Sequence, residues 1–182
     1  MNKTLKYISP AKSFTEALPL GNGSLGAMVY GGVPEEKITL NYDTFWSGTG
    51  HREEKEVSTD TLEYARKLLF EEKFWEAEQY MKENMLGFYN ESYMPLGSLN
   101  YEFEKIEEPQ EYVRSLDLEK AVLTSEFKFH GTVYTTRMFI SNPAKALVIR
   151  ITSNGPDKLS LRVELDSKVE HLAKTENKNC LL

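Results

Sequence analysis

The chain has 182 residues, of which 40% are hydrophobic and 27% charged, and its formal net charge is -6 at pH 7. This length is sufficient for one well-buried domain, and the composition is typical of a globular rather than a disordered protein. The negative charge argues against a nucleic-acid partner, because phosphate binding needs a clustered basic surface. It is compatible with a neutral substrate such as a sugar.

The cysteine content and the apolar runs exclude further classes. Cys180 is the only cysteine, so neither an intrachain disulfide nor a thiolate metal cage is possible. No run approaches the roughly 18 apolar residues of a membrane-spanning helix, and residues 1–10 lack the apolar core of a signal peptide. We therefore expect no membrane partner and a cytoplasmic location, or a secreted location if a signal peptide had been removed.

The first quarter of the chain predicts two strands, over residues 24–30 and 37–42. The stretch Gly-Gly-Val-Pro-Glu-Glu at residues 31–36 predicts a turn between them. Glu35 and Glu36 belong to this polar stretch, so we expect them to be solvated. Adjacent carboxylates point in different directions, and none of the Glu-Glu pairs in the chain is expected to form the facing pair that a glycosidase needs.

Residues 58–86 change to a helical period. Asp60 followed by Glu63 has the spacing of a capping box. Apolar residues then recur at helical spacing; they are Leu62, Ala65, Leu69, Phe74, Ala77, Met81 and Met85. The pattern predicts two short helices, or one helix bent near Glu71, as an insertion around residues 59–86 in a β domain.

Residues 97–167 carry the clearest pattern, in which apolar and polar residues alternate over 121–130 and 158–166. One buried and one wetter face are typical of half-exposed antiparallel strands. Turn signals at 130–131, 142–143 and 154–156 space these strands by roughly ten residues, as in a sandwich. The sequence therefore predicts a mainly β fold, an antiparallel sandwich of two large sheets.

Residues 21–26 match the G-x-G-x-x-G pattern of a dinucleotide site, with Asp43 about twenty residues on. Such a site requires a helix that begins at the glycines and meets the pyrophosphate. Here residues 27–30 lead directly into Gly31-Gly32, which leaves no room for a helix. Tight turns explain these glycines better.

Residues 41–48 combine amide, carboxylate, hydroxyl and indole groups at a strand end. Sugars are bound by this mixture, because polar groups hold hydroxyls and an aromatic face covers the apolar side of the ring. The alternative is an Asx-type turn with Trp46 in the core. The three histidines are isolated, so we expect no metal site and no cofactor.

Five segments stand in order along the chain: EALPLGNGSLGAM (16–28), GGVPEEKI (31–38), LNYDTFWSG (40–48), MPLGSL (94–99) and RSLDLEKA (114–121). Together they resemble the N-terminal domain of glycoside hydrolase family 95, the inverting α-L-fucosidases. The family pattern has Glu in place of Tyr42 and usually Leu in place of Phe45. The first departure leaves no family role for a carboxylate at that position.

The resemblance implies a sandwich domain over residues 1–182, truncated at its C-terminal end, that packs on a helical (α/α)6 barrel outside this chain. The barrel would supply the catalytic acids, so none is carried over and the chain alone should be inactive. The implied partners are a fucosylated oligosaccharide and the chain's own C-terminal barrel. Candidates for a substrate-rim or domain-interface role are Asn22, Asp43, Thr44, Trp46 and His51.

Two other readings stay open. A stand-alone carbohydrate-binding module would have the same fold, since sandwich folds host many functions. The chain could also be the N-terminal domain of an α-L-galactosidase or of another sandwich-plus-barrel glycosidase or phosphorylase, because residues outside it would choose the sugar.

Overall fold

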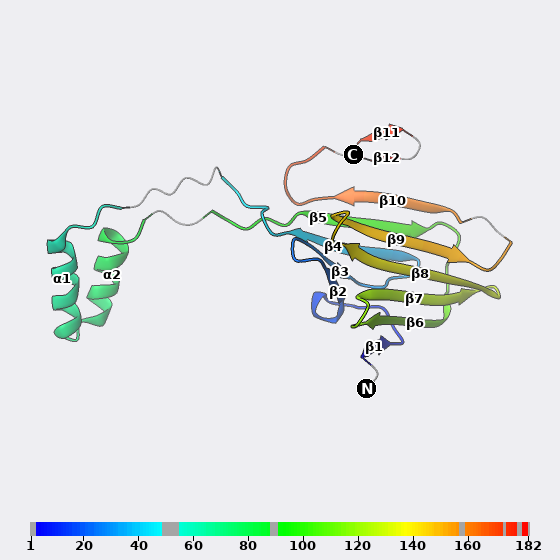
Figure 1. Ribbon diagram of the computed structural model, residues 1–182, viewed down its shortest axis with the longest axis horizontal. Coiled ribbons are helices and arrows are strands. Elements are labelled where there is room, and N and C mark those ends of the chain that lie inside the picture. Colours follow the sequence, from blue (N-terminus) through cyan, green and yellow to red (C-terminus); the bar gives the residue numbers. More distant parts are fainter. Residues whose placement is uncertain are drawn as a thin grey trace. The chain divides into compact units, whose positions relative to one another are not determined.

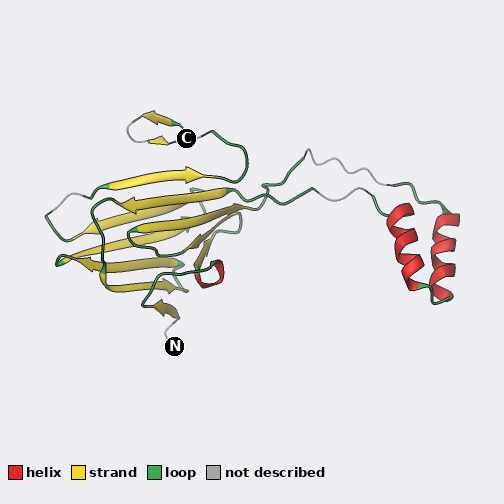
Figure 2. Ribbon diagram, turned by 180° about the vertical axis from the view of Figure 1, so that it is seen from behind, coloured by secondary structure: helices red, strands yellow, loops and turns green. Residues whose placement is uncertain are grey.

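A computed structural model describes residues 3–48, 55–87, 91–156, 159–172, 174–177 and 180–181. The chain divides into two compact units. One is a β unit formed by residues 1–45 and 94–182, and the other is formed by residues 46–93. Figure 2 shows the two long helices in the second unit and the strands in the first.

The β unit contains two five-stranded antiparallel sheets, which confirms the predicted fold class (Figure 1). The first sheet has the order β1-β6-β7-β8-β9. Its strands are β1 (Thr4–Tyr7), β6 (Gln110–Asp117), β7 (Val122–Phe129), β8 (Thr132–Ser141) and β9 (Ala146–Ser153). Consecutive strands from β6 to β9 pair with each other, so this sheet is a meander to which β1 adds an edge.

The second sheet has the order β10-β5-β4-β3-β2. Its strands are β2 (Leu18–Gly21), β3 (Leu25–Val29), β4 (Glu35–Tyr42), β5 (Gly97–Phe103) and β10 (Leu161–Asp166). A 3-10 turn, Phe14–Glu16, precedes β2, and β11 (Thr175–Asn177) pairs with β12 (Cys180–Leu181) as a separate ribbon. No helix follows the glycines of residues 21–26, because β3 begins at Leu25. The prediction that the glycines lead into a strand and not into a helix is therefore confirmed.

The inner faces of the two sheets form one hydrophobic core. The second sheet contributes Val29, Ile38 and Phe103, and the first contributes Phe127 and Met138. The alternation predicted for β7 is confirmed, since Leu123, Ser125 and Phe127, at every second position of the strand, are buried.

In β10 the predicted buried face is wrong at its centre, because Val163 is 52% exposed. β10 is an edge strand with a neighbour on one side only, which is β5.

The turns lie where glycine, asparagine and proline predicted them. His130 and Gly131 join β7 to β8 with φ of 46° and 79°, the left-handed pair that a two-residue hairpin requires. Asn142-Pro143 and Asn154-Gly155-Pro156 follow β8 and β9. The strand predicted over residues 37–42 begins two residues earlier, at Glu35.

The second unit contains two helices, α1 (Thr59–Phe70) and α2 (Phe74–Asn84). This confirms the prediction of two short helices over the alternative of one bent helix. The N-cap of α1 is Ser58, whose hydroxyl accepts a hydrogen bond from the Thr61 N–H at 3.1 Å. The predicted capping box at Asp60 is therefore wrong, because the helix begins one residue before it. No described helix has the length and apolar character needed to cross a membrane.

Candidate functional site

Asn22 shapes the β2–β3 turn and ties it to the opposite sheet. Its Oδ1 accepts hydrogen bonds from the N–H groups of Ser24 (3.0 Å) and Leu25 (2.8 Å), which is an Asx-type turn. Its Nδ2 donates to the carbonyl oxygen of Ser141, at the end of β8, at 3.2 Å. The amide of Asn22 thus has a scaffolding role and fixes one end of the sandwich.

Asp43 and Thr44 lie at this same end, directly after β4. The Asp43 N–H donates to the Ser24 carbonyl at 3.0 Å, which places Asp43 beside the β2–β3 turn. Both side chains are exposed. The structure therefore brings three of the five candidates, Asn22, Asp43 and Thr44, to one polar end of the β unit. We call these three residues the loop cluster.

Trp46 belongs to the second unit and is not in a hydrophobic core. Its ring meets that of Tyr93 edge to face, with centroids 4.9 Å apart, and the two residues form an isolated β-bridge. Beside them the Ser47 N–H donates to the Ser92 carbonyl at 2.8 Å. Trp46 is 49% exposed, so its core-packing alternative is wrong. The fifth candidate, His51, lies outside the described residues.

The prediction that the Glu36 side chain is solvated is wrong. Its side chain points into the sandwich on the same face of β4 as Ile38 and is only 2% exposed. Oε1 accepts hydrogen bonds from the N–H groups of Gly31 (2.8 Å) and Lys37 (3.0 Å). Burial raises the pKa of this carboxyl to about 7, although the backbone donors act in the opposite direction. Glu35, next to it, is exposed as predicted.

A second buried charge, Arg114 on β6, has a structural role. Its Nε donates to the Ser9 carbonyl at 2.8 Å and a guanidinium N–H donates to the Glu16 carbonyl at 2.9 Å. The guanidinium also lies 4.6 Å from the centre of the Tyr7 ring. Arg114 therefore ties the segment between β1 and β2 to the sandwich.

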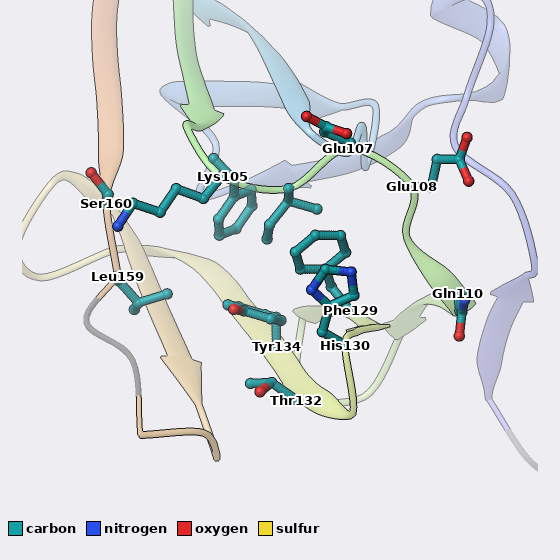
Figure 3. A pocket seen from close by; sticks show the side chains of 12 residues that line it. Lys105, Glu107, Glu108, Gln110, Phe129, His130, Thr132, Tyr134, Leu159 and Ser160 are labelled. Atoms are coloured by element: carbon teal, nitrogen blue, oxygen red, sulfur yellow. The ribbon is translucent and has the colours of Figure 1, made fainter.

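The opposite end of the β unit carries a hollow of about 560 Å³ (Figure 3). Three segments far apart in the sequence line it: the loop between β5 and β6, the β7–β8 turn and the residues that precede β10. The lining includes Lys105, Glu107, Gln110, His130, Tyr134 and Ser160. β8 runs ten residues from Thr132 at this hollow to Ser141 at Asn22. At about 3.3 Å per residue, roughly 30 Å separates the two ends. No pattern in the sequence points to this hollow.

Within the described part of the chain, no three His, Cys, Asp or Glu side chains are grouped in a way that would hold a metal ion.

Comparison with known proteins gives consistent matches. The family model described as "Glycosyl hydrolase family 65, N-terminal domain" matches residues 5–182. Alpha-L-fucosidase 2 of Arabidopsis thaliana is 31% identical over 177 residues, which cover 96% of this chain and 21% of that protein. Probable alpha-fucosidase A of Aspergillus niger is 31% identical over 148 residues, or 77% of this chain and 18% of that protein. Probable alpha-fucosidase A of Aspergillus oryzae is 29% identical over 147 residues, which cover 76% of this chain and 20% of that protein.

The chain spans about a fifth of the length of these curated relatives. The resemblance to the N-terminal domain of an α-L-fucosidase is confirmed by the family match and by the Arabidopsis relative. With a match that extends over nearly all of its residues, this chain belongs to the family of glycosyl hydrolase family 65 N-terminal domains.

Proposed function

We propose that this chain is the non-catalytic N-terminal domain of an inverting α-L-fucosidase of glycoside hydrolase family 95. The enzyme would hydrolyse terminal, mainly α-1,2-linked L-fucose from glycans. The observation that carries the proposal is the match of 96% of the chain to a protein named alpha-L-fucosidase 2. Two fungal relatives named as probable alpha-fucosidases support it.

The carboxylates of the β unit support a non-catalytic role. An inverting glycosidase needs two carboxyl groups about 6.5–9.5 Å apart across the scissile bond, with the acid member raised in pKa. Of the carboxylates that the structure describes, Glu36 alone is buried, and backbone N–H groups hold it inside the sandwich. A sugar in a surface site has no access to that carboxyl. The catalytic acids would therefore come from the helical (α/α)6 barrel of the longer enzyme.

In this proposal the loop cluster faces the barrel domain. Asn22 fixes the turn, so that the exposed side chains of Asp43 and Thr44 are held on a rigid scaffold. In the second unit Trp46 presents a half-exposed indole, which by itself suits either the rim of a sugar site or a domain interface. His51 remains a fifth candidate for the same role.

The test compares this chain with the longer enzyme that contains it. Each protein is incubated with 2′-fucosyllactose, and proton NMR follows the released sugar. We expect the longer enzyme to release L-fucose first as the β anomer, because a single displacement at an α-glycoside inverts the configuration. The 182-residue chain alone is expected to release none.

An α-L-galactoside substrate serves as the comparison, because an α-L-galactosidase would have the same layout. Preference for the galactoside by the longer enzyme would replace L-fucose by L-galactose in the proposal. Hydrolysis by the isolated chain would contradict the non-catalytic role.

A further inference from the structure

We infer that the hollow at the far end of the β unit from the loop cluster is a binding site for a neutral pyranose unit of an oligosaccharide. The inference does not depend on the proposed hydrolase activity, because it concerns a surface of this chain alone. A hollow of about 560 Å³ falls within the size range of small-molecule sites, about 300–1,000 Å³.

The floor of the hollow is apolar and firmly held. Phe103 and Ile106 are 4% and 5% exposed, respectively. The Tyr134 ring stacks on Phe127 with centroids 5.1 Å apart and an interplanar angle of 5°. The same ring meets the edge of Phe103 at 6.0 Å. This floor is therefore part of the core packing, and its half-buried rings, Tyr134 and Phe129, are the ones with surface left for the C–H face of a sugar ring.

The β7–β8 turn sets one wall. The rings of Phe129 and His130 are stacked, with centroids 4.0 Å apart. His130 has a φ of 46°, and the hairpin conformation fixes its backbone. Figure 3 shows the rings of Phe129, His130 and Tyr134 between Lys105 on one side and Thr132 on the other. The imidazole is thus presented to the hollow by a rigid turn.

Three polar side chains of the rim have no partner elsewhere in the described β unit, whereas the Ser160 hydroxyl donates to the Glu104 carboxylate. Among the described residues, the side chains of Lys105, Glu107 and Gln110 make no hydrogen bond or ion pair with one another or with their neighbours. By contrast, Glu111 and Lys128 nearby form an ion pair. An ammonium, a carboxylate and an amide on one loop offer donors and acceptors for the hydroxyl groups of a sugar.

The charge of the rim selects the class of ligand. Two carboxylates, Glu107 and Glu108, stand against the single ammonium of Lys105. This balance disfavours a phosphate or an acidic sugar, because like charges repel. A wet, polar rim disfavours a purely apolar ligand, which would leave those groups without partners. A neutral polyhydroxylated ring on the aromatic floor satisfies both parts of the site.

The experiment is a nuclear magnetic resonance titration of the 182-residue chain with lactose, 2′-fucosyllactose and 3′-sialyllactose. We expect saturable shifts of the backbone amides in residues 104–111, 130–134 and 159–161 with the two neutral sugars. The sialylated sugar is expected to bind more weakly. The double variant K105A/E107A should weaken binding of the neutral sugars by about tenfold, since it removes two hydrogen-bonding groups.

The matched control is the double variant E119A/K120A, which removes the same two charges from the exposed β6–β7 turn at the other end of the strands. The inference is overturned by an absence of saturable shifts, by shifts confined to the loop cluster, by stronger binding of the sialylated sugar, or by equal losses in the two variants. Fucose release by the longer enzyme is measured separately, so each of the two proposals can fail without the other.

Discussion

Tyr112 on β6 donates its hydroxyl proton to the carbonyl oxygen of Gly31, which follows β3 in the opposite sheet. The N–H of the same glycine donates to the buried carboxyl of Glu36 at 2.8 Å. Gly31 is therefore held through both of its backbone polar groups, and its φ of +73° is one that side chains rarely adopt. The glycine pair that the sequence indicated as a turn is also a junction between the sheets.

Gly31→Ala is expected to destabilise the chain more than Gly23→Ala. Both glycines have positive φ, +73° and +94°, which costs a non-glycine residue about 1–2 kcal/mol. A Cβ at Gly31 would also lie 2.4 Å from the Tyr112 hydroxyl and 2.9 Å from Arg114 Cδ, whereas one at Gly23 meets nothing within 4 Å. We expect the difference to exceed about 1 kcal/mol in urea unfolding. Equal losses of stability in the two variants would show that the contacts around Gly31 accommodate the added methyl group at no cost in free energy.

Glu36 is expected to make the stability of the chain fall with rising pH. The folded chain holds the Glu36 proton up to a pKa of about 7, against an ordinary value of 4.5. Between these two pH values the folded state binds more protons than the unfolded state, so the free energy of unfolding decreases as pH rises. At about 1.36 kcal/mol per pKa unit, the full decrease is about 3 kcal/mol.

The measurement is chemical unfolding of the wild type, Glu36→Gln and Glu35→Gln from pH 4.5 to 8. Glu36→Gln should lose this decrease, because a neutral amide does not titrate. Glu35→Gln should keep it, since Glu35 is exposed. Parallel pH curves for the wild type and Glu36→Gln would contradict the assignment.

The sandwich was predictable because alternation and turn chemistry are local signals. Residues 121–130 show the period of two, and His130-Gly131 shows the turn that follows. The burial of Glu36 is harder to predict, because the polar pair Glu35-Glu36 directly follows the turn residues and looks like their continuation. A usable signal was present: Glu36 lies two and four residues before Ile38 and Leu40, which places all three on one face of a strand.

The two polar ends of the β unit differ in how far sequence could reveal them. Asn22 and Asp43 flank one hairpin, in which β3 pairs with β4 and Leu25 lies opposite Tyr42, so neighbouring elements bring their segments together. The hollow depends on three segments that meet only through the pairing of β5, β7, β8 and β10. Such pairing follows from the global topology, which a local pattern does not specify.

Asn22 offers a test of scaffolding at the loop cluster. Asn22→Ala removes both the Asx-type turn and the bond to Ser141, and should cost about 2 kcal/mol of stability. Asn22→Asp keeps the acceptor for Ser24 and Leu25 but loses the Nδ2 donor, so a loss of about half that size is expected. Urea unfolding gives the values, and hydrogen exchange at the Ser24 and Leu25 amides shows whether the turn persists. Identical exchange rates in the wild type and Asn22→Ala would show that the Asn22 side chain does not stabilise the turn.

The cap of α1 distinguishes the structure from the capping box that the sequence suggested. Ser58→Ala removes the acceptor for the Thr61 N–H and should cost about 1 kcal/mol of helix stability. Asp60→Ala, which lies within the first turn, should cost less, through its favourable interaction with the helix dipole alone. Hydrogen exchange at the amides of α1 reports both changes. A larger effect for Asp60→Ala would restore the capping box.

Trp46→Ala tests whether the exposed indole serves the proposed enzyme. Its ring is 49% exposed and contacts Tyr93 edge to face, a contact worth about 0.5–1.5 kcal/mol. In the longer enzyme we expect kcat/KM for 2′-fucosyllactose to fall by about tenfold while the melting temperature changes little. The control is Trp75→Ala on α2, because Trp75 is the other tryptophan and is 70% exposed.

If the Trp46 ring lines the substrate rim, the loss should appear mainly in KM, because the ring would contribute the same binding energy to substrate and transition state. A loss of activity that tracks a loss of melting temperature would instead assign Trp46 to a domain interface. Unchanged kinetics together with unchanged stability would remove Trp46 from both roles and leave Asp43 and Thr44, the exposed side chains of the loop cluster, as the next residues to test.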